Sequence, residues 1–595
     1  MTRKTIFRCA FSVLLFTGIM LFLWLRCPQY LLYQEQYQLF QFTGDYFLSS
    51  ISMPGGLADY LSEFVVQFYY VPLYGSMLTA LVLTITQAAL GLAFRRSALQ
   101  ETAYVLSAIP SVIYLGAMAD ENILLSFAVA MMLTSLFILI LSLSETKSAT
   151  VDTIALIAGF ALLYWLAGPF AFIFIAAGGI MRRRLISAVI AFATAFAIVW
   201  AIDRLWLAQY PLSRLLLGIN YYRVPEIYPL PFYVIAAAYI IAAATVILPP
   251  SVSRFPKAIA TAAVIVFAVM YVPLCYNSEK GRVLAYDSLV RQGRWNDIIA
   301  KAEKERPSDI FSLQALNLAL GMTGQLTENM FRFNQQGVEG LIGKNRLDNT
   351  TQLITAEALY RLGLTNIAFS TTFDLQEAIM NDRKSGRMMK RMAECMLING
   401  NYKVAAKYIA MLRPTLFYSD WAKQAESLLN NDRAVETHPV YGPMRRNAFR
   451  KVAFYDHTQL DKILAMHAVD SEGANTLAWQ YFCAAAMLKG ELATLTGIYN
   501  YSSRQFSAGP IPRHVQEALA MYWTFSHSSF DSVPFPISGE VQRLTADLAQ
   551  AVMRNQNNPS AWQAAAPGSF GVYFLTNARR QQASEQTQQY QHTHE

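Results

Sequence analysis

Residues 152–184 read DTIALIAGFALLYWLAGPFAFIFIAAGGIMRRR, an apolar stretch that ends in three arginines. A stretch of this length crosses a membrane either as one tilted helix or as two short helices that turn at Gly168-Pro169. One helix would place Arg182–Arg184 outside, whereas two helices place them inside. Because Lys and Arg concentrate in cytoplasmic loops, the sequence predicts two short helices here.

The same apolar pattern recurs through the first 276 residues and predicts nine membrane spans, with the N-terminus inside. The predicted spans are about 5–25, 74–94, 102–118, 122–143, 150–166, 169–181, 185–202, 231–248 and 258–275. The cations at their inner ends are Arg3, Lys4, Arg8, Arg95, Arg96, Lys147, Arg182, Arg183, Arg184, Arg254 and Lys257. The outer loops hold only Arg26, Arg204, Arg214 and Arg223, so this topology follows the positive-inside rule.

An odd number of spans places everything after Tyr276 outside. Within this half Gly293, Gly324, Gly363 and Gly400 recur at intervals of 31, 39 and 37 residues, each between two helix-like patterns. The spacing predicts tetratricopeptide-like helical repeats, which the stretch HPVYGPM (438–444) divides. The expected fold is therefore all-α. Its parts are a transmembrane domain (1–276), two helical domains (277–437 and 438–580) and a disordered tail (581–595).

Composition excludes some functions. The net charge of +8 comes largely from cations beside the apolar runs, and no basic stripe alternates with stacking aromatics, so nucleic acid is not an expected partner. Cys27 and Cys275 both fall at outer ends of predicted spans. In an oxidising compartment they form a disulfide or remain two free thiols, and the sequence leaves both alternatives open.

The first outer loop, residues 28–72, contains an expected interfacial helix that follows Pro54-Gly55-Gly56. Asp59 and Glu63, the latter a candidate binding residue, recur on one side of this helix, opposite an apolar stripe. The helix either packs on the membrane part with its acids in water, or forms a carboxylate-bearing lid over a membrane-embedded site. Asp45, earlier in the same loop, has the same two interpretations.

The other outer loops also carry candidate residues. Asp120 and Glu121 lie in the short second loop, where they mark the water boundary or belong to a site. The third loop, 203–230, holds candidate binding residues near aromatic side chains: Arg204, Arg214, Tyr222 and Arg223. Arginine forks bind phosphate, so these residues either hold a lipid diphosphate or extend to phospholipid headgroups.

No histidine precedes His438, which excludes a histidine-rich zinc or iron site in the membrane half. The four candidate catalytic carboxylates, Asp45, Asp59, Asp120 and Glu121, are suited to a hard divalent cation, Mg or Mn.

The segments EQYQLFQFTGDYF and MPGGLADYLSEFVVQFYY, followed by a membrane run and a helical second half, resemble an uncharacterised family of inner-membrane proteins of Gram-negative bacteria. The layout also resembles C-type, polyprenyl-phosphate-dependent glycosyltransferases, which have a long first outer loop with an essential acid, a short second loop and a soluble outer domain. That resemblance implies a first-loop acid at Asp45 or Asp59, second-loop acids at Asp120 and Glu121, and a phosphate clamp at Arg214 and Arg223.

Two classes of function follow. The first is an enzyme that moves a sugar from a polyprenyl-phosphate donor at the periplasmic face, with Asp45 or Asp59 as the base. The second is a scaffold in the inner membrane whose repeats bind an envelope protein or peptide.

Overall fold

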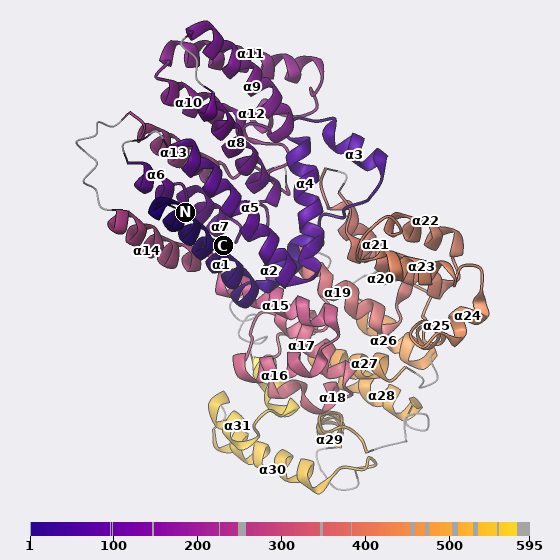
Figure 1. The fold of residues 1–595 in the computed structure, drawn as a ribbon. Coiled ribbons are helices and arrows are strands. Elements are labelled where there is room, and N and C mark those ends of the chain that lie inside the picture. The colour runs from indigo at the N-terminus through magenta and orange to yellow at the C-terminus, as the bar shows by residue number, and fades with distance from the viewer. Residues whose placement is uncertain are drawn as a thin grey trace, which may run out of the picture. The chain divides into compact units, whose positions relative to one another are not determined.

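The computed structural model describes residues 2–95, 97, 99–144, 148–224, 226–247, 257–344, 349–381, 383–452, 459–470, 475–502, 510–527, 533–555 and 558–579. The described chain is all-helical, apart from an isolated antiparallel bridge between Ile123 and Tyr222 (Figure 1). Of the predicted features, the inner cations Arg96, Lys147 and Arg254 and the tail 581–595 lie outside these residues.

The chain divides into two compact units. Unit 1 comprises Met1–Gly281 together with two segments from the second half of the chain, Ile379–Met389 and Ala410–Gln424. Unit 2 comprises Arg282–Ala378, Lys390–Ile409 and Ala425–Glu595. Two pieces of the second half therefore fold with the apolar first half.

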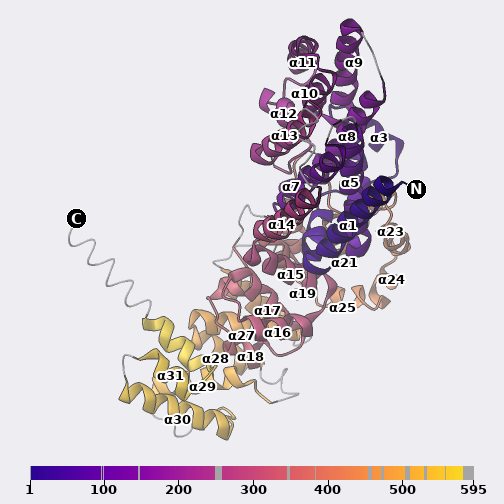
Figure 2. The same cartoon turned by 60° about the vertical axis from the view of Figure 1, so that its left-hand side comes forward.

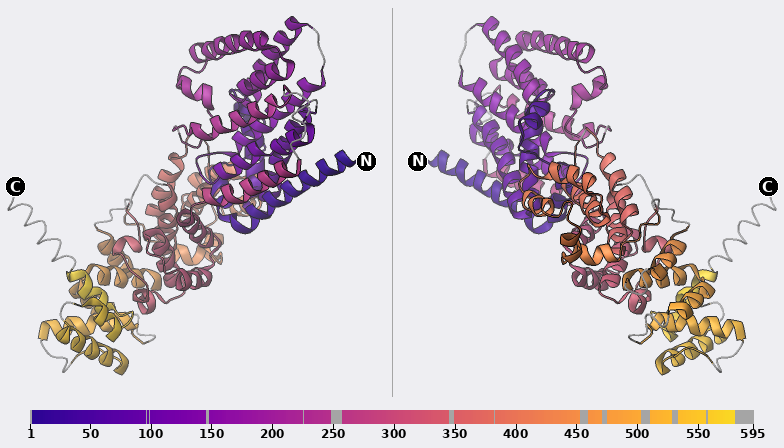
Figure 3. Two further views of the ribbon diagram at one scale, coloured as in Figure 1. Left: turned by 90° about the vertical axis from the view of Figure 1, so that its left-hand side faces the viewer. Right: turned by 90° about the vertical axis from the view of Figure 1, so that its right-hand side faces the viewer.

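Six helices of unit 1 are long and apolar enough to cross a membrane, which is compatible with a multi-pass membrane protein. They are α1 (Arg3–Arg26), α5 (Pro72–Ala93), α8 (Leu125–Leu143), α9 (Ala149–Ala167), α11 (Leu185–Leu205) and α14 (Lys257–Cys275). α5 packs between α1 and α8, and α9 packs against α11, as Figures 1 and 2 show. Figure 3 shows α1 as one uninterrupted helix that carries the N-terminus at its end.

Shorter helices occupy the other three predicted spans. They are α6 (Gln100–Leu106), α7 (Ile109–Ala117), α10 (Ala171–Arg182) and α13 (Pro229–Ala244). At 1.5 Å per residue, the 12 residues of α10 and the 16 of α13 give lengths of roughly 18 and 24 Å, below the ~30 Å hydrocarbon thickness. The predicted span 102–118 is divided between α6 and α7, and Pro110 lies in the first turn of α7. The nine-span topology stays a prediction.

The turn within residues 152–184 is confirmed as a break between two helices. α9 ends at Ala167 and α10 begins at Ala171, and Gly168 between them has φ +80°. Only glycine adopts such a backbone angle readily, so the chain stops one helix and starts the next at this residue. A ring cluster of Phe127, Phe170 and Tyr221 packs beside the break, with ring centroids 5.0–5.6 Å apart.

The loops of unit 1 contain their own short helices. These are α2 (Pro28–Glu35), α3 (Gly44–Ile51), α4 (Gly56–Val66), the 3-10 turn η1 (Gln67–Tyr70) and α12 (Leu212–Leu217). α4 packs against α8 and α9. The loop 28–72 is therefore held against the long helices through α4.

Unit 2 consists of successive helices. Their bounds are α16 (Trp295–Glu305), α17 (Ile310–Met322), α18 (Leu326–Asn329), η3 (Met330–Arg332), η4 (Val338–Gly340), α19 (Asn349–Leu362), α20 (Thr365–Glu377), α24 (Asp432–Thr437), α25 (Tyr441–Arg446), α26 (Leu460–Asp470), α27 (Thr476–Lys489), α28 (Leu492–Ser502), α29 (Arg513–His527), α30 (Gly539–Arg554) and α31 (Pro559–Ala565). Four further helices are divided between the units: α15 (Ser278–Gln292), α21 (Gly386–Asn399), α22 (Tyr402–Leu412) and α23 (Ser419–Glu426). Towards the carboxyl end α29 packs on α30 and α30 on α31 (Figures 2 and 3).

The recurring glycines do separate pairs of helices. Gly293, Gly324, Gly363, Gly400 and Gly490 each follow one helix, precede another and have φ between +66° and +86°. A residue in this left-handed conformation ends a helix and reverses the chain. The sequence pattern thus marks true ends of helices in the second half, and the tetratricopeptide character of these helices stays a prediction.

Candidate functional site

The first-loop helix α4 starts from a tightly packed glycine turn. Gly55 has φ +81° and its N–H donates to the carbonyl oxygen of Trp165, at the end of α9, over 2.9 Å. A Cβ on Gly56 would lie 2.0 Å from the carbonyl oxygen of Ser50. Gly55 therefore supplies the left-handed backbone angle that precedes α4, and Gly56 supplies the space that α4 needs beside the end of α3.

A distant arginine pairs with both acids of α4. Arg383 Nη2 lies 2.6 Å from Asp59 Oδ1, and Arg383 Nε lies 3.1 Å from Glu63 Oε1. The side chains of Arg383 and Glu63 are each 6 % exposed and that of Asp59 is 15 % exposed. The structure therefore does not leave these acids in open water. It encloses them with a partner that lies 320 and 324 residues away in the sequence.

Burial and charge act in opposite directions on these carboxyls. Burial raises the pKa of both Asp59 and Glu63, and the Arg383 guanidinium partly offsets that rise. The two carboxylates in turn raise the pKa of Arg383, so it remains a cation although it is buried. When both acids are ionised, the group of three carries one net negative charge.

Arg383 reaches α4 because its segment docks on the loop 28–72. The Leu39 N–H donates to the carbonyl oxygen of Lys384 over 2.9 Å, and Arg387 donates to the Gln36 side chain over 2.7 Å. Tyr418 donates to the buried carboxylate of Glu35 over 2.9 Å. The polar run EQYQLFQF, in which residues 35–40 are all buried, is thus the surface on which the second half of the chain docks within unit 1.

A cavity of about 260 Å³ lies beside the ion pairs. Three separate parts of unit 1 line it, namely the loop 28–72, the loop 203–230 and the docked segment. Its lining residues are Leu39, Gln41, Tyr46, Ser49, Ser50, Met53, Asp59, Glu63, Tyr210, Asn220, Asn381, Arg383 and Lys384. The cavity combines carboxylates, cations, amides and hydroxyls, which suits a polar ligand.

The other predicted acids lie elsewhere. Asp45 is exposed in the first turn of α3. Asp120 accepts a hydrogen bond from the Asn122 N–H over 3.0 Å and so stabilises its own turn. Glu121 forms an ion pair with Lys280. None of these three acids lines the cavity.

The predicted third-loop residues also have distinct environments. Arg204 is 68 % exposed and lies 3.6 Å from Asp203, whereas Arg214 is buried and donates to the Ile219 carbonyl oxygen over 2.8 Å. Arg223 donates to Tyr33 over 3.2 Å and lies over the ring of Tyr37 at 4.4 Å.

Tyr222 is fully buried, and its backbone forms the bridge with Ile123 that joins the second and third loops. Of the nine predicted site residues, the cavity therefore brings together Asp59 and Glu63.

Sequence reasoning missed Arg383, Lys384, Glu35 and Tyr418. The first two lie in a polar stretch, NDRKSGR, which has the composition of a surface loop. A local signal was present at Glu35, since a run of polar residues just after the first apolar helix needs partners if it is buried. Within the described chain, no three His, Cys, Asp or Glu side chains gather into a group suited to a metal ion.

The cysteine alternative is settled in favour of thiols. Cys27 and Cys275, both described, are free in the structure, and burial raises the pKa of Cys27 to about 12.

Fold and site together define an all-helical protein with six helices able to cross a membrane and a charged cavity among its loops. The model of a family described as a family of unknown function, DUF6057, matches residues 3–575, and the chain belongs to that family. Comparison with curated proteins and with solved structures found no match.

Proposed function

We propose that the cavity beside Asp59 and Glu63 is the active site of a lipid-linked sugar transferase. In this proposal the protein spans the bacterial inner membrane nine times with its N-terminus inside. The cavity then opens at the periplasmic face, where the tetratricopeptide-like half also lies. The donor is a sugar on a polyprenyl phosphate.

One observation carries this proposal: a single cavity collects acids from the first loop, polar groups from the third loop and two cations from the docked segment. Asp59 is the more exposed of the two acids, and a buried carboxylate with a raised pKa is a stronger base. Asp59 takes the proton of the acceptor hydroxyl as its oxygen attacks the sugar's anomeric carbon. The bond from that carbon to the phosphate oxygen breaks, and the phosphate leaves as an anion stabilised by Arg383 and Lys384.

The two ion pairs of Arg383 allow Asp59 to be neutralised without leaving Arg383 unpaired. In an Asp59→Asn variant Arg383 still faces Glu63, so the remaining pair is neutral and the fold should be kept. We expect this variant, at normal membrane abundance, to lose one envelope glycan and to accumulate its lipid-linked precursor in a deletion strain. Asp45→Asn, on the exposed helix α3, is the matched control and should complement fully. Normal glycans with Asp59→Asn would refute the transferase.

A scaffold is the second candidate, and a separate observation favours it. Unit 2 has an open cleft of about 700 Å³ whose lining includes Arg446, Arg450 and Lys451 as well as Asp432 and Asp470. A cleft with both signs of charge suits a folded or extended envelope peptide. If Asp59→Asn leaves the envelope glycans unchanged, the scaffold is tested by crosslinking from the variant Arg446→Cys in the cleft. The control is Arg294→Cys at an exposed position outside the cleft, and only Arg446→Cys should crosslink to a partner.

A further inference from the structure

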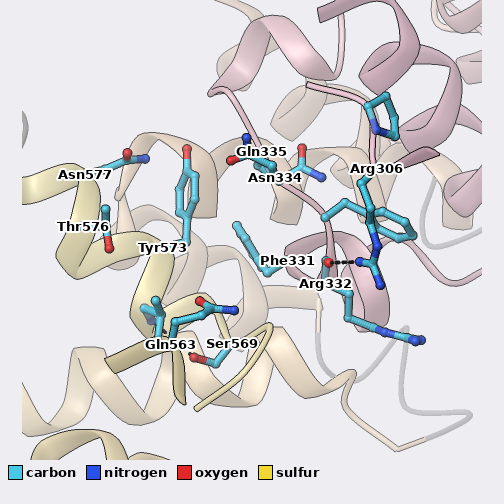
Figure 4. A pocket seen from close by; sticks show the side chains of 13 residues that line it. Arg306, Phe331, Arg332, Asn334, Gln335, Gln563, Ser569, Tyr573, Thr576 and Asn577 are labelled. Carbon is cyan, nitrogen blue, oxygen red and sulfur yellow. Dashed lines mark hydrogen bonds between the residues drawn. The ribbon is translucent and has the colours of Figure 1, made fainter. Parts of the chain in front are cut away.

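A second pocket, in unit 2, has a different chemistry. It encloses about 350 Å³ between residues 306–335 and the carboxyl-terminal residues 563–577. Figure 4 shows Phe331 and Tyr573 at its centre, with Arg306 on one side and Thr576 and Asn577 on the other. This volume is suited to a ligand of monosaccharide size.

Aromatic packing builds the floor. The Phe331 ring centroid lies 4.9 Å from that of Tyr573, 5.3 Å from Phe570 and 4.9 Å from His514. Buried Gln335 donates to the Met330 carbonyl oxygen over 2.8 Å and exchanges hydrogen bonds with Asn317. These contacts hold the floor in one conformation before any ligand arrives.

The two sides meet through a close backbone approach. Gly568 has φ +62°, and a Cβ there would lie 3.2 Å from the Cα of Arg332. Arg306 has φ +49° at the end of α16, and its Nη1 donates to the Arg332 carbonyl oxygen over 3.0 Å. The Arg306 guanidinium also lies 5.8 Å from the ring centroid of Phe333. The neighbours of Arg306 are thus a carbonyl group and a ring, and among the described residues no carboxylate forms an ion pair with it.

The lining is cationic and rich in hydrogen-bonding groups. Of the described residues that line the pocket, two are arginines and none is Asp or Glu. Asn334, Gln563, Thr576 and Asn577 offer amide or hydroxyl groups that both donate and accept. Arginine prefers carboxylate and phosphate oxygens, amides and hydroxyls match sugar hydroxyls, and aromatic rings match the flat apolar face of a sugar.

We propose that this pocket binds a small hydroxyl-rich anion, of the class of sugar acids and sugar phosphates, through Arg306. The proposal concerns unit 2 alone and does not depend on the transferase. It gives the second half of the chain a small-molecule ligand in addition to any protein partner.

The test is a binding titration of the full-length protein in detergent micelles, by calorimetry or saturation-transfer NMR. The probes are glucuronate, glucose 6-phosphate and neutral glucose, so that a carboxylate and a phosphate are distinguished from the sugar alone. We expect at least one anion to bind about tenfold or more tightly than glucose, since a charged hydrogen bond is removed in the neutral probe.

Three variants separate binding from folding. Arg306→Gln should weaken the bound anion about tenfold or more, whereas Arg306→Lys, which keeps the charge but loses the guanidinium, should lose less affinity than Arg306→Gln. Arg294→Gln removes another exposed arginine of unit 2 and should have no effect. Equal binding of all three probes, no binding to the wild type, or an equal loss with Arg294→Gln would overturn the proposal.

Discussion

Replacing Arg383 by Met should strongly destabilise unit 1. Arg383 is buried between Asp59 and Glu63, and the substitution keeps an unbranched apolar stem but removes the guanidinium and its charge. Removal of one partner from a buried ion pair typically costs about 3–5 kcal/mol, because the other charge is left without compensation. Here two carboxylates lose their partner, so we expect a loss at the upper end of this range.

The loss should depend on pH with a definite sign. Burial already raises the pKa of Asp59 and Glu63, and without Arg383 the opposing influence disappears and the pKa of both carboxyls rises further. A carboxyl whose pKa is higher in the folded state favours folding when it is protonated and loses that contribution as pH rises through the folded pKa. The deficit of the Arg383→Met variant should therefore be largest near pH 8 and should shrink as the pH is lowered towards 5.

The assay is unfolding in dodecylmaltoside micelles by titration with SDS, followed by tryptophan fluorescence at both pH values. Arg294→Met is the matched control, because the pair of Arg294 with Asp297 is about half exposed and such pairs contribute at most about 1 kcal/mol. The triple variant Asp59→Asn, Glu63→Gln, Arg383→Met removes all three charges and should recover most of the stability.

Two outcomes would refute this reasoning. If Arg383→Met unfolds at the same SDS fraction as the wild type, the ion pairs do not stabilise the folded protein. If the triple variant is less stable than the single one, the loss comes from packing around Arg383 and not from unpaired carboxylates.

Three further predictions concern other positions. Gly363→Ala should lower the free energy of unfolding by about 3 kcal/mol or more, because its Cβ would lie 2.4 Å from the Asn447 carbonyl oxygen. Gly324→Ala has open space around it and should lower that free energy by only about 1–2 kcal/mol, for the backbone angle alone. Thermal melts of the two variants check this difference. Burial lowers the pKa of His467, so unit 2 should keep its stability above about pH 6.5 and lose it as the pH falls from there towards the lowered pKa, and His467→Gln should flatten that dependence in the same melts. Cys27, whose pKa is about 12, should react with maleimide at neutral pH only after denaturation, and labelling of the native protein at this residue would contradict its burial.

Local patterns predicted much of the fold. The charge distribution over the loops placed a helix break at Gly168, and the recurring glycines marked helix ends because a left-handed glycine ends a helix locally. Pro110 was also visible in the sequence, and it lies where the predicted span 102–118 divides into two helices. A proline favours the first turn of a helix, so this division was predictable from the same evidence.

The candidate site was only half predictable. The helical spacing identified the acidic side of α4, and both of its acids line the cavity. Their partner Arg383 follows more than 300 residues later in a polar stretch, and no periodicity links the two. An ion pair between residues this far apart depends on the tertiary fold. A single sequence predicts local structure from nearby residues, and it holds no local pattern that identifies such a partner.

The ion pair with Arg383 also has a consequence for biosynthesis. Glu63 is made 320 residues before Arg383, and at roughly 5–20 residues per second the ribosome needs about 16 to 64 s to add that length. During that time α4 carries two acids that cannot yet be enclosed without their cation. The loop 28–72 therefore stays incompletely folded until late in translation, and a nascent chain stalled before residue 383 should expose this loop to protease.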